Sequence, residues 1–402
     1  MLAQLRRLAR EKPLVLFAWM LAGLLAWGLA STDLRYAFAH EGWQAGPGAL
    51  LGRDFVNLFT AGHLLLEGKL AIIYDLGAYQ AYQREMFAGA VLAHNYSYSP
   101  VSFFYVWLFA LGGYGLSYLL WIGLTGAAFL LAARPYLKGA GLPAWLALLI
   151  PAAAANVWAG HYGFLFGALW LGAWRLLETR PRLSGVLIGL MIVKPHLALL
   201  MPLALMRRGA WTPLFYAGLT STWLVALSGT LFGWHYWATY LTETSALQAA
   251  MLDQTGAFFL RMMPTVLPSL LLAGLDYPAA AIAQAAVGLA AAAALWKWMP
   301  RDPMQAGLAT ATATFLLLPY AFNYDLCVIG IAALLAMHRA GADEPPLRRL
   351  PAILAFLLPL LVVNLNNLGI PAGPPILALL LATQLREGRS RAAAPPPRLA
   401  AA

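Results

Sequence analysis

An aspartate stands at the head of an amphipathic segment just beyond the first apolar run. The stretch GRDFVNLFTAGHLLLEG covers residues 52–68, and Asp54 lies near its start. Its apolar side chains fall on one face at helical spacing, namely Phe55, Leu58, Phe59, Leu65 and Leu66. A carboxylate fixed at the mouth of a membrane is a candidate for chemistry. Asp before such a run is also a good helix N-cap, and the two roles are compatible because a cap position fixes the carboxylate's direction.

A lysine embedded in an apolar run is the second candidate. The stretch MIVKPHLALL (191–200) places Lys194 among apolar residues on both sides, with His196 two positions later. An ionisable group in such a place is costly, and by default it marks a functional site. The alternative is that the ammonium snorkels to the outer interface. At the outer end of a helix pair, an ammonium suits a phosphate.

Three further segments each carry one candidate side chain. Tyr98 lies in HNYSYSP (94–100), His161 lies in the turn WAGHYG (158–163), and Arg261 lies in GAFFLRMMPT (256–265). Each has a structural alternative: an interfacial aromatic belt for the tyrosine, an interface position for the histidine, and an amphipathic helix for the arginine.

The last candidate segment is LLLPYAFNYDLCVIG (316–330), which ends one apolar span and begins another. Four polar residues are clustered in it: Tyr320, Asn323, Tyr324 and Asp325. One polar residue would indicate a turn, whereas four fit a polar pocket as well as a turn.

The composition determines the class of elements that hold these residues. Of 402 residues, 61% are hydrophobic and 10% are charged, and the mean hydropathy is +0.69. Apolar runs such as 13–30 and 279–296 are long enough to cross most of a hydrocarbon core of about 30 Å. Helices are required because an open sheet edge in lipid leaves backbone groups unpaired. The sequence therefore predicts an all-α, polytopic transmembrane bundle of roughly 10–13 membrane helices.

The basic residues indicate which loops face the cytoplasm. With the N-terminus inside, 20 of the 26 Lys and Arg fall in inward-facing clusters, at 6–12, 134–138, 175–182, 207–208, 297–301, 339–349 and 386–398. The basic start and the first apolar run indicate an uncleaved signal anchor. The candidate spans are 14–30, 115–133, 143–157, 161–177, 183–206, 212–231, 279–298, 304–318, 325–338, 350–366 and 371–385.

The basic clusters 175–182 and 207–208 both face the cytoplasm, so the chain must cross the membrane an even number of times between them. We therefore predict that Lys194-Pro195 splits the run 183–206 into two short helices that meet near the outer face. The same argument makes 101–112 and 264–274 half-entering or surface helices. The outer face then collects the first outer loop, 31–100, and all the candidate side chains. We expect one membrane domain over 1–391 and a disordered, Pro/Ala-rich cytoplasmic tail over 392–402.

Several classes of protein are disfavoured. The net charge of +10 is scattered over span ends, which disfavours nucleic-acid binding. The sequence contains no Gly-rich phosphate loop, no Walker lysine motif and no CxxC or HExxH metal motif, so no cofactor or metal is expected. The single cysteine, Cys327, excludes an internal disulfide. The lack of a visible internal repeat weakens a transporter built from inverted halves.

The order of these segments resembles glycosyltransferase family 87, a polytopic family of the GT-C class. The matching pieces are GRDFVNLFTAGHLLLEGKLAIIYD, YSP before an apolar segment, GHYGFLFGALWLGAWRLLETRPRLSGVLIGLMIVKPHLALLMPLALMRRGAW, and LLLPYAFNYDL, from about residue 50 to 335. Many members have His after the proline of the last piece, where this chain has Tyr320.

The resemblance implies a donor, a face of the membrane and a base. It implies a polyprenyl-phosphate sugar, with mannose expected first, and a lipid or glycan acceptor at the periplasmic or extracellular side of the inner (plasma) membrane. Asp54 occupies the place of the proposed base, and direct displacement would invert the anomeric carbon. Lys194 and Arg261 are expected near the leaving phosphate, with Tyr320 as a hydrogen-bond donor. The other expected substrate-binding residues are Asn323, Tyr324, Asp325, His161, His196 and Tyr98.

Two rival classes remain open. A transporter or flippase of lipid-linked saccharides would also need outward polar residues and an intramembrane lysine, but it should show a polar path to the cytoplasmic side. A structural or assembly protein would tolerate the loss of Asp54.

Overall fold

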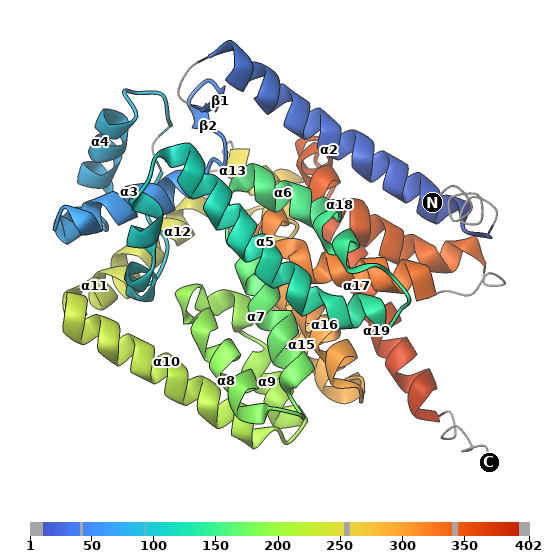
Figure 1. Cartoon of the computed structure of the whole chain (residues 1–402). Helices are drawn as coiled ribbons and strands as arrows, with labels where there is room; N and C mark the ends of the chain where they lie inside the picture. The colour runs from blue at the N-terminus through green and yellow to red at the C-terminus, as the bar shows by residue number, and fades with distance from the viewer. Residues whose placement is uncertain (1–10, 41–42, 93, 253–257, 340–344, 394–402) are drawn as a thin grey trace.

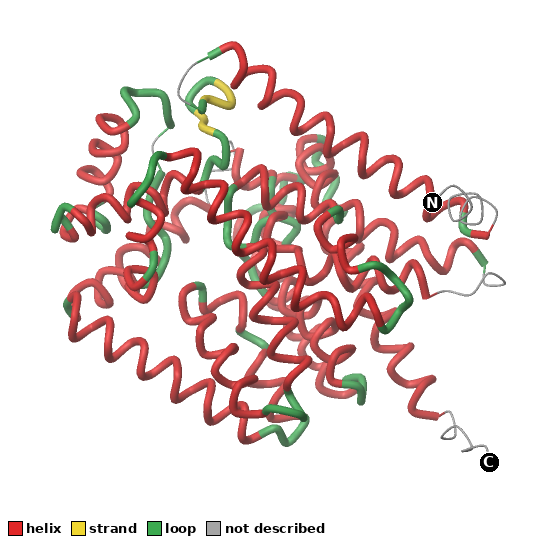
Figure 2. Tube along the Cα trace, in the orientation of Figure 1, coloured by secondary structure: helices red, strands yellow, loops and turns green. Residues whose placement is uncertain are grey.

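The computed structural model describes residues 11–40, 43–92, 94–252, 258–339 and 345–393. Over these residues the protein is a bundle of helices with one small hairpin, formed by β1 (Gln44–Gly46) and β2 (Ala49–Leu50) (Figures 1 and 2). The predicted all-α fold class is confirmed.

Five helical segments of the described chain are long and apolar enough to cross a membrane. They are α2 (Pro13–Ala39), α5 (Tyr114–Lys138), α10 (Trp211–Phe232), α15 (Tyr277–Trp298) and Leu347–Asn367, which contains α18 (Leu350–Asn367). These helices carry large apolar side chains that the rest of the protein leaves exposed: Leu24 is 67% exposed and Trp223 is 60% exposed. Apolar surface of this extent marks contact with lipid, so the chain is a membrane protein.

Shorter helices form the centre of the bundle. They are α7 (Gly163–Leu176), α16 (Pro303–Leu317) and α17 (Cys327–Arg339), and every residue of α16 from Ala306 to Leu316 is buried. The buried hydroxyls of α16 donate to carbonyls of its own preceding turn, as Thr310 does to Ala306 at 2.7 Å. These hydroxyls are therefore paired within an apolar centre.

One predicted span is wrong as a continuous helix. The segment 143–157 consists of a 3₁₀ helix, η4 (Ala144–Leu148), followed by α6 (Pro151–Ala159). Pro151 lacks an N–H and fits the first position of a helix, so the chain restarts there.

The predicted break at Lys194 is confirmed. The chain runs through α8 (Pro181–Gly189) and η5 (Leu190–Val193), then restarts as η6 (Pro195–Ala198) and α9 (Met201–Arg207). Lys194 has φ −133° and ψ 73°, outside the helical region. The ring of the following proline disfavours a helical conformation at this residue, so the local sequence itself specifies the break.

The segment predicted as the first outer loop begins later than residue 31, because α2 continues to Ala39. After the hairpin the chain forms α3 (Phe55–Leu66), η1 (Leu70–Ile72) and α4 (Leu76–Met86). The run 101–112 consists of two 3₁₀ helices, η2 (Pro100–Phe104) and η3 (Val106–Ala110), rather than a span.

After α10 the chain crosses back beneath the segment that holds α3, η1 and α4 (Figure 1). It forms α11 (Trp234–Thr239), a π-helical turn η7 (Tyr240–Thr244) and α12 (Ser245–Leu252), and the ring of Tyr236 lies 6.1 Å from that of Tyr74. The remaining elements are α13 (Phe258–Arg261), α14 (Val266–Leu272), η8 (Asn323–Leu326), η9 (Pro346–Arg349) and α19 (Gly373–Ala393). Residues 394–402 of the predicted tail lie outside the described residues.

We predict that Gly163→Ala destabilises the fold. A Cβ at Gly163 would lie 2.2 Å from the carbonyl oxygen of Tyr324 and 2.7 Å from Asn156 Oδ1, and a backbone carbonyl cannot swing aside. Overpacking of this kind costs about 1–3 kcal/mol, which thermal unfolding in detergent would register as a lower midpoint. Gly123→Ala is the matched control, because nothing lies within 4 Å of its Cβ position. Equal midpoints for the two variants would contradict the close contact.

Candidate functional site

The ends of several helices and the turns between them enclose a cavity of about 550 Å³. Its walls come from the turn before α3, the loop before η2, the turn between α6 and α7, the Lys194 break and the turn before α17. The polar and aromatic residues that line it include Arg53, Asp54, His94, Tyr98, Trp158, His161, Lys194, His196, Tyr320 and Tyr324.

Two turns pressed against each other fix the backbone of Asp54. Its N–H donates to the carbonyl of Ala159 at 3.0 Å. Gly160, at φ 66°, ends α6, and a Cβ there would lie 2.3 Å from the carbonyl oxygen of Gly52. Only a glycine permits this approach, so the glycine that ends α6 also seats the aspartate.

The N-cap interpretation of Asp54 is wrong. The residue occupies the position before α3, but its φ of −69° and ψ of −15° are already helical and its side chain accepts no hydrogen bond from the helix backbone. The carboxylate is partly buried and lines the cavity. It is therefore available for another role.

Arg53 joins this turn to the first span. Its guanidinium makes a two-pronged contact with Asp33 of α2, in which Nη2 donates to Oδ1 at 2.9 Å and Nη1 donates to Oδ2. The guanidinium carbon also lies 3.7 Å from the centre of the Trp158 ring. Arg53 has φ 24°, an unfavourable value for a residue with a side chain, which these contacts hold in place.

Lys194 is held by a buried carboxylate. Its Nζ lies 3.3 Å from Asp325 Oδ1, and the two side chains are 6% and 1% exposed. Asp325 Oδ2 accepts from the N–H of Phe322 at 3.3 Å, and Oδ1 lies 3.9 Å from His161 Nδ1. His161 Nε2 shares a hydrogen bond with the Tyr98 hydroxyl at 2.9 Å. The pair thus links three turns that lie far apart in the sequence.

Four nitrogens around the cavity have no hydrogen-bond partner in the described chain. They are His94 Nε2, Trp158 Nε1, His161 Nδ1 and His196 Nε2. All four residues line the cavity. Buried polar atoms are usually paired, so nitrogens gathered around one space indicate a polar ligand with acceptor oxygens.

Burial raises the pKa of Asp54 above its ordinary value of 3.8. His94, a hydrogen-bonding interaction with the Tyr324 side chain, Lys194 and Arg53 act against this shift, in decreasing order. Burial also lowers the pKa of His94, although the charge of Asp54 opposes the change. At neutral pH the histidine is therefore uncharged, and the carboxylate is a stronger base than an exposed aspartate.

The structure brings most of the expected site residues together. Tyr98, His161, Lys194, His196, Tyr320 and Tyr324 line the same cavity as Asp54. Arg261 is not among the described residues of that wall, although it lies on the neighbouring α13. Asn323 turns away, and its amide donates to the carbonyl of Pro359 at 2.8 Å. Asp325 does not line the cavity, but its carboxylate contacts Lys194, which does.

Three cavity residues were missed as site candidates: Arg53, His94 and Trp158. All three lie in the segments quoted for other residues. A signal for Arg53 was its place next to Asp54, whereas nothing local indicates that His94 faces the cavity. Within the described residues, no group of three His, Cys, Asp or Glu side chains is placed to hold a metal ion.

We predict that Asp325→Asn destabilises the protein, because it leaves the Lys194 ammonium buried without a counter-charge. Breaking one side of such a pair costs about 3–5 kcal/mol. The double variant Lys194→Met, Asp325→Leu should recover most of that loss, because no charge remains to be buried. Thermal unfolding of the wild type, Asp325→Asn and the double variant in detergent measures the loss and its recovery. A double variant no more stable than Asp325→Asn would contradict it.

A model described as glycosyltransferase family 87 matches residues 96–320, which is more than half of the chain. Curated proteins and solved structures gave no match. The matched range contains Tyr98, His161, Lys194 and Tyr320, and it begins after Asp54.

Proposed function

The chain belongs to glycosyltransferase family 87 and is therefore a glycosyltransferase of the membrane, and from this premise we propose the substrates, the base and the face of its reaction. The donor is a polyprenyl-phosphate sugar, with mannose as the sugar to test first. The acceptor is a hydroxyl of a lipid or glycan. The reaction takes place at the non-cytoplasmic face of the plasma membrane, with Asp54 as the general base.

One observation carries this proposal: a carboxylate, an ammonium and several unpaired ring nitrogens share one cavity. Asp54 stands on one wall, and Lys194 and His196 stand on another. Sugar transfer from a phosphate requires these two kinds of group, one to take the proton of the acceptor and one to stabilise the leaving phosphate.

These positions support the following reaction. Asp54 takes the proton of the acceptor hydroxyl while that oxygen forms a bond to the anomeric carbon. The bond between the anomeric carbon and the phosphate oxygen breaks, and the electron pair leaves with the polyprenyl phosphate. Attack from the face opposite the leaving group inverts the anomeric carbon. The raised pKa of Asp54 supports this role, because a stronger base gains more from taking the proton.

Lys194 is the cation assigned to the phosphate. An ammonium has three N–H donors, and its contact with Asp325 leaves others free for a phosphate oxygen. Its buried partner fixes the direction of the ammonium before the substrate arrives, which favours charge stabilisation without reorganisation. The unpaired nitrogens of His161 and His196 add neutral donors, and Tyr320 adds a hydroxyl. Arg261 has no part in this scheme.

The apolar part of the cavity suits the lipid portion of such a donor. Phe258, Phe259 and Met262 line it beside the polar groups, and the side chain of Phe258 is 52% exposed. An isoprene unit next to the phosphate would find apolar partners there while its reacting end faces Asp54.

We predict that Asp54→Asn keeps the fold and loses transfer by about 10²–10⁴-fold, because an amide cannot accept the proton. The substitution removes no helix cap, since the carboxylate makes none. The measurement is sugar transfer in membranes, with a panel of polyprenyl-phosphate sugars that includes mannose. Asp302→Asn is the matched control, because Asp302 caps α16 by accepting from the N–H of Gln305 and lies outside the cavity. Near-normal transfer by Asp54→Asn would remove this residue from the mechanism.

We also predict the pH dependence of kcat/KM. Only ionised Asp54 can act as the base, so the rate should rise with pH through the pKa of this group and then level off. Because burial raises that pKa above 3.8, the acidic limb should lie at higher pH than that of an exposed aspartate. Thermal unfolding midpoints across the same pH range would separate loss of catalysis from loss of fold. An acidic limb at or below the ordinary value would contradict the assignment.

A further inference from the structure

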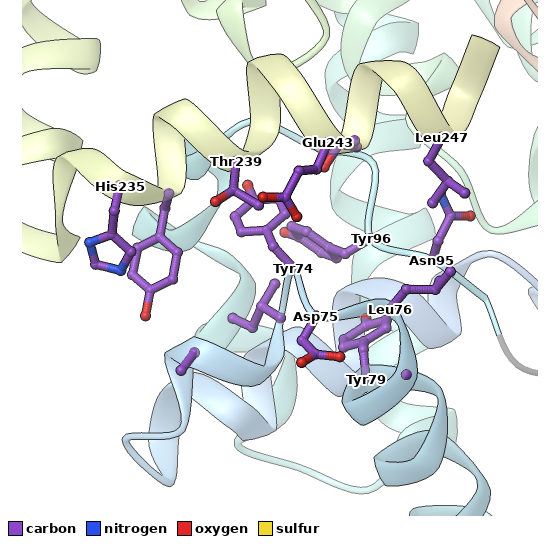
Figure 3. Close-up of a pocket in the computed structure, with 15 residues that line it drawn as sticks. Tyr74, Asp75, Leu76, Tyr79, Asn95, Tyr96, His235, Thr239, Glu243 and Leu247 are labelled. Atoms are coloured by element: carbon purple, nitrogen blue, oxygen red, sulfur yellow. The ribbon is translucent and has the colours of Figure 1, made fainter. Parts of the chain in front are cut away.

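A second cavity of about 590 Å³ lies beside the first. It lies between the segment that holds η1 and α4 and the helical segment α11–α12. One wall comes from η1, the loop after it and α4, and carries Tyr74 and Asp75. The facing wall comes from α11, η7 and α12, and carries Tyr236 and Glu243. Figure 3 shows these two walls with Tyr96 between them.

The two cavities meet at the loop before η2. Asn95 lines both of them. On α12, Leu247 lines the second cavity and its neighbour Gln248 lines the first. The second cavity therefore adjoins the cavity that Asp54 lines.

A network of hydrogen bonds fixes this boundary. The hydroxyl of Tyr79, which lines the second cavity, donates to the carbonyl of Asn57, one turn beyond Asp54, at 3.0 Å. Gln83 donates to Asn57 Oδ1 at 3.3 Å and accepts from the N–H of His94 at 2.7 Å. The loop that separates the cavities is thus tied to both α3 and α4.

The second cavity differs from the first in charge. Asp75 and Glu243 line it, and the described residues of its walls include no Lys or Arg. Neither carboxylate forms a salt bridge within the described chain. Asp75 uses Oδ1 to accept from the N–H of Ala78 at 2.9 Å, which leaves Oδ2 for another donor. Carboxylates without cations disfavour a phosphate and accept hydrogen bonds from hydroxyl groups.

Tyrosine rings also line this cavity and are held in place. The ring of Tyr74 lies 5.7 Å from that of Tyr96 and 6.1 Å from that of Tyr236. The Tyr74 hydroxyl donates to the carbonyl of Tyr98 at 2.6 Å, and the Tyr96 hydroxyl shares a hydrogen bond with Ser102 Oγ at 2.6 Å. The hydroxyls are thereby occupied, and the fixed ring faces are apolar surfaces beside the two carboxylates.

We infer that this second cavity binds the neutral saccharide part of the acceptor. A sugar has hydroxyls that donate to carboxylates and an apolar C–H face that packs on aromatic rings, and the cavity offers both kinds of partner. The phosphate of the donor takes the cavity with the cations, and the uncharged acceptor takes the cavity with the carboxylates. This inference rests on the proposed function, because it assigns a place to the second substrate of the same reaction.

Binding without turnover tests the inference separately from the proposed function. The full-length protein in lipid nanodiscs is titrated with neutral tetrasaccharides of mannose, glucose, galactose or arabinose, and with geranyl phosphate as a probe of the first cavity. We expect Asp75→Asn and Glu243→Gln each to weaken tetrasaccharide binding about tenfold, since each removes a charged acceptor. Both variants should leave geranyl phosphate binding unchanged. A failure of every donor to support transfer would count against the proposed function and leave this measurement intact.

Matched controls separate recognition from folding. Asp276→Asn alters a capping aspartate of α15, which accepts from the N–H of Ala279 at 2.9 Å just as Asp75 does from Ala78. Glu85→Gln neutralises an exposed glutamate of α4 outside the cavity. Both should bind tetrasaccharides as the wild type does. The inference is overturned if no tetrasaccharide binds the wild type, or if the cavity variants bind as tightly as the controls. Binding of Ca²⁺ or Mg²⁺ that both cavity variants lose, without saccharide binding, would assign a cation site instead.

Discussion

The candidate site depends on one buried ion pair. An ammonium removed from water requires a counter-charge, and Lys194 finds it in Asp325, on the turn before α17. Asp325 also accepts from the backbone of Phe322 and approaches His161, which in turn bonds to Tyr98. Three turns with no proximity in the sequence are thereby drawn to one place. The cavity forms where they meet.

The broken helices around the cavity satisfy a second constraint. Backbone groups freed at a helix break are costly near lipid unless the protein pairs them. Here the breaks pair with one another: Asp54 N–H donates to Ala159, Ser99 N–H donates to Val193, and Asn323 N–H donates to Met262. Each break therefore supplies a hydrogen-bond partner to another segment, and the irregular segments stabilise one another.

Local patterns in the sequence predicted the fold better than they predicted the site. The apolar run 304–318 became α16 within one residue at each end, and the proline after Lys194 broke the helix as expected. The direction in which a single side chain points was harder to predict, because it depends on partners that are distant in the sequence. Asn323 turned toward Pro359, and His94 entered the cavity through contacts that no short stretch encodes. Arg261 was chosen as the only Lys or Arg in the loop 232–262, and neither charge nor loop reveals which wall a residue joins.

The contact between Arg53 and Asp33 changes what the first helix is for. A hydrophobic N-terminal segment can serve only as a targeting signal, which directs the chain to the membrane and is not needed afterwards. In this chain that segment carries the carboxylate that holds the residue next to Asp54. Cutting the helix away would leave the Arg53 guanidinium without this carboxylate beside Asp54. The helix Pro13–Ala39 is thus also a component of the candidate site.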